Sequence, residues 1–206
     1  MRAADVVKAL QQVASPERAK NSEWFFKTGP GQYGEGDVFI GVTVPNQRKV
    51  AKQYVGLSFG EVEKLLLSPV HEERLTGLLI LVYRFKKSDE QARGEIYDFY
   101  MAHTKRVNNW DLVDSSASNI VGAYLADKDR AVLYELARSD NLWERRIAII
   151  ATAHFISLGE SKDTFAIAEI LLGDTHDLIH KAVGWMLREV GKNCGQEAEE
   201  EFLKKH

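Results

Sequence analysis

The sequence predicts an all-α fold, and three observations lead to that prediction. Apolar residues recur at intervals of three and four through most of the chain, which is the period of a helix with one buried face. Only four prolines occur in 206 residues, so long stretches contain no helix breaker. Each proline also stands near the start of a segment, and proline is tolerated at the first position of a helix.

Helix starts can be followed along the chain. Ser15-Pro16-Glu17 is typical of an N-cap followed by proline at the first helical position. Two further proline patterns and two capping-box spacings predict other starts: Val44-Pro45-Asn46, Ser68-Pro69, Ser58 with Glu61, and Ser88 with Gln91. Apolar faces at 75–85, 147–153 and 179–190 follow.

The number and spacing of the helices indicate a repeat architecture. We expect roughly eleven or twelve helices of about 10 to 18 residues. They pair off about every 35 to 45 residues, which is the length of a HEAT-like repeat. We therefore predict HEAT-like repeats of antiparallel helix pairs over residues 1–206, forming a single domain. Stacked as a curved α-α superhelix, they would present a concave binding face to an extended ligand. A compact all-α bundle is the alternative.

Composition limits the compartment and the partners. Hydrophobic residues make up 45% and charged residues 28% of the chain, as in globular proteins. The formal charge of −3 gives no global attraction to nucleic acid or to an anionic membrane, so DNA binding would need a local basic face. A single cysteine, Cys194, no apolar run near 18 residues and no signal-peptide pattern predict a cytoplasmic protein.

One segment interrupts the helical pattern. Residues 27–42, KTGPGQYGEGDVFIGV, contain five glycines and a proline, which is too many for a helix. The segment lacks the lysine and Ser/Thr of a phosphate-binding loop. It is interpreted either as a long connector or as a loop that closes over a ligand.

The stretch VNNWDLVDSS, residues 107–116, places two acids at a predicted helix start near Asn109. Asp111 falls in the first turn, where the helix dipole favours an acid. Asp114 lies one turn beyond Trp110 on the same face and interrupts a mostly apolar stripe. A carboxylate in that position needs a partner or a function, so the fragment alone predicts either a structural salt bridge or a catalytic acid.

Basic residues stand beside aromatic or apolar positions in two further segments. In HKAVGWMLREV, residues 180–190, Trp185 is flanked by Lys181 and Arg188, which suits a phosphate backbone and a base or sugar, or simply covers the indole. In NLWERRIAII, residues 141–150, Arg146 falls on a largely apolar face and needs an anion, either a carboxylate or a phosphate. Arg145 lies about 100° round the helix.

Two patterns with metal-site spacing are weak. HDLIH, residues 176–180, has two histidines at i and i+4, but no third ligand is apparent nearby. DKDR, residues 127–130, lacks the glycine and glutamate of a calcium loop. We expect no metal and no cofactor.

Together, NNWDLVDSS, SDNLWERRIAII and HKAVGWMLREVGK resemble three motifs of the HEAT-like DNA alkylation repair glycosylases, the AlkD family. The resemblance is strongest from about residue 70 to 192. It implies a catalytic role for Asp114, with Trp110 and Trp185 flanking the sugar and Arg146 holding a backbone phosphate. It also implies DNA contacts by Arg48 and Arg188. We count Lys49, Arg145 and Lys181 among the expected DNA contacts.

The resemblance implies a monofunctional DNA glycosylase. Such an enzyme hydrolyses the N-glycosidic bond of cationic alkylated purines, of the 3-methyladenine and 7-methylguanine type, in duplex DNA. The expected partner is double-stranded DNA with alkylated bases, bound by a monomer. The alternative is a non-catalytic HEAT-like scaffold that binds nucleic acid or a protein. The glycine-rich segment is a departure from the family pattern and could alter access to the site.

Overall fold

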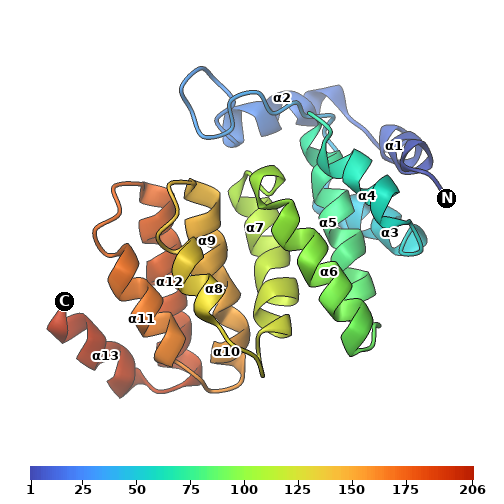
Figure 1. Cartoon of the computed structure of the whole chain (residues 1–206). Helices are drawn as coiled ribbons and strands as arrows, with labels where there is room; N and C mark the ends of the chain where they lie inside the picture. The colour runs from blue at the N-terminus through green and yellow to red at the C-terminus, as the bar shows by residue number, and fades with distance from the viewer. The chain divides into compact units, whose positions relative to one another are not determined.

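The computed structural model describes residues 1–206, and its regular structure is entirely helical. The only β-type pairing is an isolated bridge between Val38 and Val70. The chain divides into two compact units, Met1–Leu112 and Val113–His206. Each unit has helices that pack side by side around its own core (Figure 1). The predicted all-α fold of paired helices is confirmed, whereas the single domain over 1–206 stays a prediction.

The first unit is built around one buried helix. α5 is apolar on nearly every side from Leu75 to Phe85, and it packs against α3, α4 and α6. The predicted apolar face at 75–85 is therefore confirmed. The helices of this unit are α1 (Ala3–Gln11), α2 (Pro16–Phe25), α3 (Val44–Gln53), α4 (Phe59–Leu66), α5 (His71–Phe85), α6 (Glu90–Ala102) and a short 3₁₀ turn, η1 (Thr104–Arg106).

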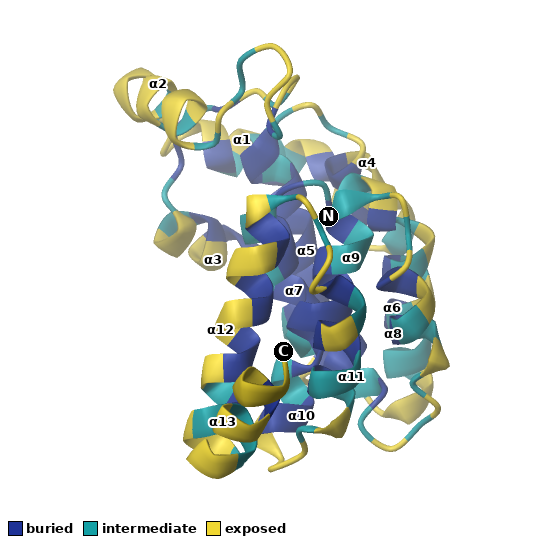
Figure 2. Cartoon of the chain, turned by 90° about the vertical axis from the view of Figure 1, so that its left-hand side faces the viewer, coloured by how far each residue is buried: buried dark blue, intermediate teal, exposed yellow.

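The boundary between the units falls within α7 (Trp110–Ala117), and the second unit continues with a π-helical turn, η2 (Ser118–Gly122). Its core is formed by α9 and α12, whose inner faces are fully buried (Figure 2). The remaining helices are α8 (Ala131–Leu136), α9 (Leu142–Ala151), α10 (Ala153–Ser157), α11 (Lys162–Leu171), α12 (Asp177–Asn193) and α13 (Gln196–Lys205). α9 and α10 are separated by Thr152 alone.

The proline patterns located the helix starts well. Ser15 caps α2, with its hydroxyl accepting the Arg18 backbone N–H, and proline follows at the first helical position. α3 begins at Val44, as predicted. The Ser68-Pro69 pattern lies slightly too early, because α5 begins only at His71. The Ser68 hydroxyl forms a local turn instead, accepting the Val70 backbone N–H.

Neither predicted capping box forms. Ser58 stands at the N-cap of α4 without a side-chain bond to the helix, and Glu61 accepts the backbone N–H of Ala3 instead. The Ser88 box is wrong because α6 begins one residue later. Asp89 is the cap, and its carboxylate accepts the backbone N–H three residues on.

The glycine-rich segment folds as irregular turns that are tied to the start of α5. The Glu72 carboxylate, which is buried, accepts the backbone N–H groups of Ile40, Gly41 and Val42 at 2.8 to 3.2 Å. Gly41 has φ 75°, and a Cβ there would collide with the carbonyl of Ser15. The end of the segment, residues 37–42, is therefore held against α5, which brings Asp37 and Phe39 to that helix.

Candidate functional site

Two of the predicted site residues, Trp110 and Asp114, lie on α7. The helix begins at Trp110, whose backbone N–H donates to the Asn109 side-chain oxygen at 2.8 Å. Asp111 and Asp114 follow in the first and second turns. The predicted start near Asn109 is confirmed, and Trp110 and Asp114 share the helix at i and i+4.

Within the second unit, Asp114 is paired with Arg146 of α9. The guanidinium Nε donates to Asp114 Oδ1 at 2.9 Å, and Nη2 donates to Oδ2 at 2.8 Å. The side chains are 18% and 6% exposed for Asp114 and Arg146. A bidentate pair of this kind fixes the plane of the carboxylate. The carboxylate is thus oriented and still partly exposed to solvent.

The third donor of Arg146 ties this pair to α12. Nη1 donates to the carbonyl oxygen of Leu178 in the first turn of α12. The resemblance assigned Arg146 to a backbone phosphate, but in the structure all its nitrogens donate inside the protein and its side chain is buried. The structure therefore places Arg146 as a group that positions Asp114.

The outer face of α12 carries the second predicted tryptophan. Trp185 is 36% exposed, while the neighbouring stripe Ile179, Val183 and Met186 is buried as the periodicity predicted. Leu178, which Arg146 contacts, and Trp185 are two turns apart on the same side of α12, seven residues along the helix.

Basic side chains flank Trp185 on both sides. Lys181 is exposed and pairs with Asp177 at 3.0 Å, a contact between two mobile surface groups. Arg188 is exposed and forms no ion pair. The Trp185 indole N–H donates to Glu189. This face of α12 offers an aromatic surface between two cations, which suits a nucleic-acid strand.

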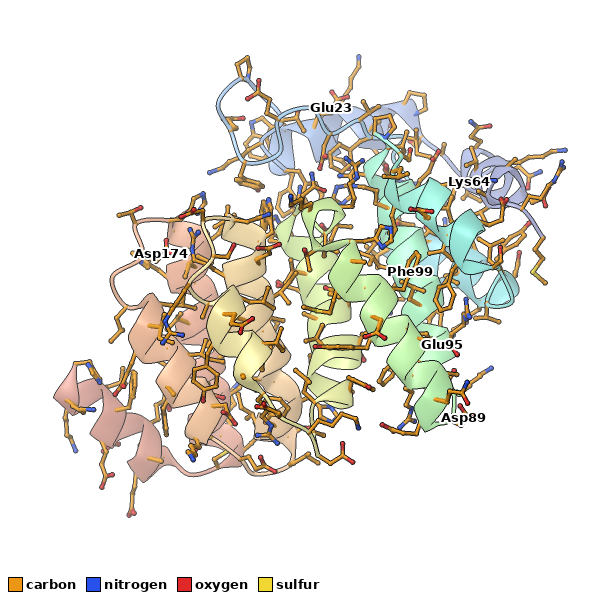
Figure 3. All side chains as sticks on the ribbon, in the orientation of Figure 1. Glu23, Lys64, Asp89, Glu95, Phe99 and Asp174 are labelled. Atoms are coloured by element: carbon orange, nitrogen blue, oxygen red, sulfur yellow. The ribbon has the colours of Figure 1, made fainter.

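The other side chains predicted to contact DNA differ in whether they already have partners within the protein. Arg48 and Lys49 are exposed on α3 and form no ion pair. Arg145 is occupied within the protein: its Nε donates at 2.6 Å to Asp174, which is labelled in Figure 3, and Nη1 donates to the carbonyl oxygen of Ser139. Because its guanidinium is already bound to these partners, Arg145 is not part of the proposed DNA-binding surface.

The surroundings of Trp110 contain a buried polar network that the sequence reasoning missed. His71, at the start of α5, lies between two carboxylates, with Nδ1 3.0 Å from Asp37 and Nε2 2.8 Å from Asp111. The His71 side chain is 2% exposed. Arg74 donates to the other oxygen of Asp37, and Asn109 donates to Asp37 at 3.1 Å. Long sequence separations between these residues left no local pattern to find.

Charges in this network support one another. Burial alone would lower the pKa of His71, but the charge and hydrogen bond of Asp111, together with Asp37, raise it to about 9. Burial would raise the pKa of Asp37, yet the hydrogen bond from His71 and the charge of Arg74 hold it below its usual value. At neutral pH the cluster therefore has two cations facing two carboxylates.

A ring stack covers this network. The Phe26 ring is parallel to Trp110 at 5.2 Å and to Phe39 at 5.0 Å, with 18° between the planes in both cases. The His71 ring contacts Phe26 at 4.9 Å and Phe39 at 4.6 Å. Phe25 meets the Trp110 ring edge-on at 5.9 Å.

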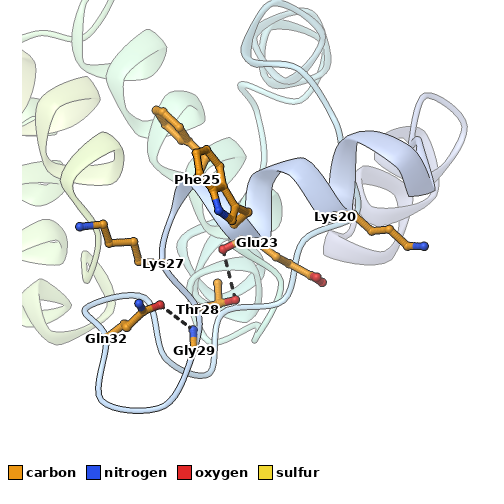
Figure 4. Close-up of a pocket in the computed structure, with 8 residues that line it drawn as sticks. Lys20, Glu23, Phe25, Lys27, Thr28, Gly29 and Gln32 are labelled. Atoms are coloured by element: carbon orange, nitrogen blue, oxygen red, sulfur yellow. Dashed lines mark hydrogen bonds between the residues drawn. The ribbon is translucent and has the colours of Figure 1, made fainter.

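α2 presents a second aromatic surface that was not predicted. The helix buries none of its residues, and Trp24 and Phe25 are 83% and 56% exposed. A hollow of about 680 Å³ lies beside them, lined also by Lys20 and Lys27 (Figure 4). Exposed aromatic rings among cations are the residue types that contact nucleic-acid strands.

The histidines of HDLIH have structural partners. His176 Nδ1 accepts the Leu178 backbone N–H and caps α12, and the His180 ring bonds to the Asp174 carbonyl oxygen. No group of three His, Cys, Asp or Glu side chains is placed to hold a metal ion. None of the helices is both long and apolar enough to cross a membrane.

Comparison with known proteins gives a family match and a shared fold. A family model described as "DNA alkylation repair enzyme" matches residues 6–206. No curated protein matches the chain. A solved structure described as "Predicted DNA alkylation repair enzyme from Enterococcus faecalis" is similar with a TM-score of 0.71 and 18% identity, over 94% of this chain and 90% of that chain. At that identity the structural likeness shows the fold alone.

Proposed function

The chain belongs to the DNA alkylation repair enzyme family, as the resemblance predicted, and from this premise we propose that it is a monofunctional DNA glycosylase. Its substrates would be cationic N-alkylated purines of the 3-methyladenine and 7-methylguanine type in duplex DNA. The observation that supports this most is the Asp114 carboxylate, which Arg146 holds by both oxygens while 18% of the side chain is exposed.

The reaction suits a fixed carboxylate. Alkylation gives the base a positive charge, so it leaves with the electron pair of the C1′–N bond and becomes neutral. The sugar then carries developing positive charge, which a preorganised carboxylate stabilises. Water adds its oxygen to C1′ and passes a proton to Asp114 or to solvent. No metal or nucleophilic lysine is required in this scheme.

The other residues fit supporting roles. Arg146 keeps the Asp114 carboxylate oriented before substrate arrives, so little reorganisation is needed during the reaction. Trp110 and Trp185 would supply electron-rich faces that stabilise positive charge. Arg48, Lys49, Lys181 and Arg188 would contact phosphates, which fix the register of the protein on the duplex.

Base release from methylated duplex DNA tests the proposal. We expect the wild type to release 3- and 7-methylpurines, and Asp114→Asn to release them at least about tenfold more slowly, because losing an electrostatic stabiliser commonly costs about 10²–10³-fold. Released bases are separated by chromatography and quantified under single-turnover conditions. Circular dichroism and urea unfolding establish that the variant is folded.

Asp174→Asn is the matched control. It also removes an acid from a buried arginine pair in the second unit, because Asp174 is bound to Arg145 and its side chain is 6% exposed. We expect its release rate to stay within about twofold of the wild type, since Asp174 has no part in the proposed chemistry. Equal release by the wild type and Asp114→Asn would refute the role of Asp114. A folded wild type that binds duplex DNA without releasing base would favour the non-catalytic scaffold.

A further inference from the structure

We propose that Phe26 and His71 are positioning residues for Trp110: Phe26 sets the plane of its indole ring, and His71 fixes the start of the helix that carries it. This inference rests on the proposed function, because it gives the position of Trp110 a catalytic consequence. All the residues concerned lie within the first unit.

Phe26 is the central ring of the stack. Its ring lies parallel to the indole of Trp110 and to Phe39, and it also touches the His71 ring. The ring of Phe39 touches His71 as well. An indole stacked on a ring that is itself held by two others cannot rotate about its side-chain bonds without losing that contact. The tilt of Trp110 is therefore set by Phe26.

The polar network fixes the backbone under the indole. An ionised carboxylate can only accept hydrogen bonds. Each ring nitrogen of His71 faces a carboxylate, so both nitrogens carry a hydrogen and donate it. One donor holds Asp111, the residue after Trp110. The other holds Asp37, which also accepts from Asn109, the residue before Trp110. His71 thus reaches both neighbours of Trp110.

The network joins segments that are distant in sequence. Asp37 comes from the glycine-rich connector, His71 and Arg74 from the start of α5, and Asn109 and Asp111 from the start of α7. A helix start that needed only stability could be capped locally, as Asp89 caps α6. Here the Asn109 side-chain oxygen accepts the first backbone N–H of α7, and the additional buried charges act on the residue on each side of Trp110.

Single-turnover base release tests the catalytic consequence. We expect Phe26→Leu and His71→Gln to lower the rate at saturating DNA at least about tenfold, because misplacing a group by about 1 Å can cost about 10²-fold. The Kd for duplex DNA should change by less than about threefold, since the interaction is needed in the transition state. Phe26→Tyr keeps the flat ring, so this variant should retain the wild-type rate.

Phe99→Leu is the matched control. Phe99 on α6 is also in the first unit, stacks on Phe59 at 4.8 Å and touches the ring of His103, as Phe26 touches Phe39 and His71 (Figure 3). If Phe99→Leu lowers the rate as much as Phe26→Leu does, the loss reflects general destabilisation and the positioning role is refuted.

A second readout does not depend on activity. In a protein with Trp24, Trp143 and Trp185 replaced by Phe, fluorescence reports Trp110 alone. Acrylamide quenching of Trp110 should rise when Phe26→Leu or His71→Gln is added to this protein. With Phe26→Tyr, quenching should stay at the level of the protein that keeps Phe26. Unchanged quenching in both folded variants overturns the proposal even if the wild type releases base. Changed quenching with no base release from the wild type supports the positioning of Trp110 and refutes only the glycosylase function.

If one variant does not fold, the other still decides, because Phe26→Leu leaves the charge network intact and His71→Gln leaves the Phe26 ring in contact with Trp110 and Phe39. Failure of both to fold, with Phe26→Tyr normal in quenching and rate, would mean that the cluster serves stability, and the proposal would be refuted.

Discussion

At the scale of single residues, His71 links the stability of the first unit to pH. Its side chain is almost fully buried between Asp37 and Asp111, with Arg74 as the other charged group beside it. The folded state therefore binds the His71 proton more tightly than the unfolded state, and its pKa rises from 6.5 to about 9. A group with a raised pKa stabilises the fold fully below its unfolded pKa, and the stabilisation is lost as the pH rises through the folded pKa.

We therefore predict that the free energy of unfolding falls between about pH 6.5 and 9 by an amount on the order of 3 kcal/mol. Urea unfolding followed by circular dichroism at pH 6, 7.5 and 9.5 measures the change. His71→Gln should be less stable at pH 6 and should lose most of this pH dependence. A wild type and a His71→Gln variant with parallel pH profiles would contradict the prediction.

The sequence distinguishes the roles of Asp111 and Asp114 in VNNWDLVDSS only in part. Helical spacing showed that Asp114 shares a face with Trp110 and that Asp111 does not. Their partners could not be read from spacing, because Arg146 and His71 are separated from them by 32 and 40 residues. Spacing predicts Asp111 only as a first-turn acid, whereas in the structure its carboxylate also accepts a hydrogen bond from the buried His71. The fragment alone allows either a salt bridge or a catalytic acid at Asp114, and the structure contains the salt bridge.

At the scale of elements, buried faces were easier to predict than helix ends. A face is determined by several residues, so the stripes on α5, α9 and α12 tolerate an error at any single position. A cap depends on one side chain and its local geometry, and Asp89 displaced Ser88 by a single residue. The π-helical turn after α7 left no periodic signal, since it occupies only five residues, Ser118–Gly122.

Gly122 at the end of that turn allows η2 to pack closely against the end of α9. A Cβ at Gly122 would collide with the carbonyl of Ala151 and press on His154. We predict that Gly122→Ala lowers the free energy of unfolding by about 1–3 kcal/mol through overpacking. Urea unfolding gives the value, and Gly184→Ala on α12 is the control.

Gly184 is exposed in mid-helix with no atom near its missing Cβ. Alanine there should raise the free energy of unfolding by about 0.5–1 kcal/mol, because it loses less backbone entropy on folding. Equal effects of the two substitutions would show that Gly122 is not constrained by packing.

At the scale of the whole molecule, a formal charge of −3 conflicts with a DNA partner unless cations are placed selectively. Many basic residues are engaged with acids: Arg145 and Arg146 in buried pairs, Lys204 and Lys205 with glutamates on the surface. Arg48, Lys49 and Arg188 form no such pair. Composition alone could not separate these two groups, because pairing depends on the fold.

This division predicts which cations bind the duplex. Each phosphate contact that is lost should reduce the slope of log K against log salt by about 1, so Arg48→Ala with Lys49→Ala should reduce it by about 2. Lys204→Ala with Lys205→Ala changes the formal charge by the same amount, yet it should leave the slope unchanged because both lysines lie on α13, which carries none of the proposed DNA contacts. Fluorescence anisotropy with undamaged duplex DNA at several salt concentrations measures both slopes.

Identical slopes for the two double variants would mean that net charge, and not the exposed face of α3, determines the affinity. A wild type without salt-dependent affinity would instead contradict a DNA partner and leave the exposed cations of α3 without the role assigned to them.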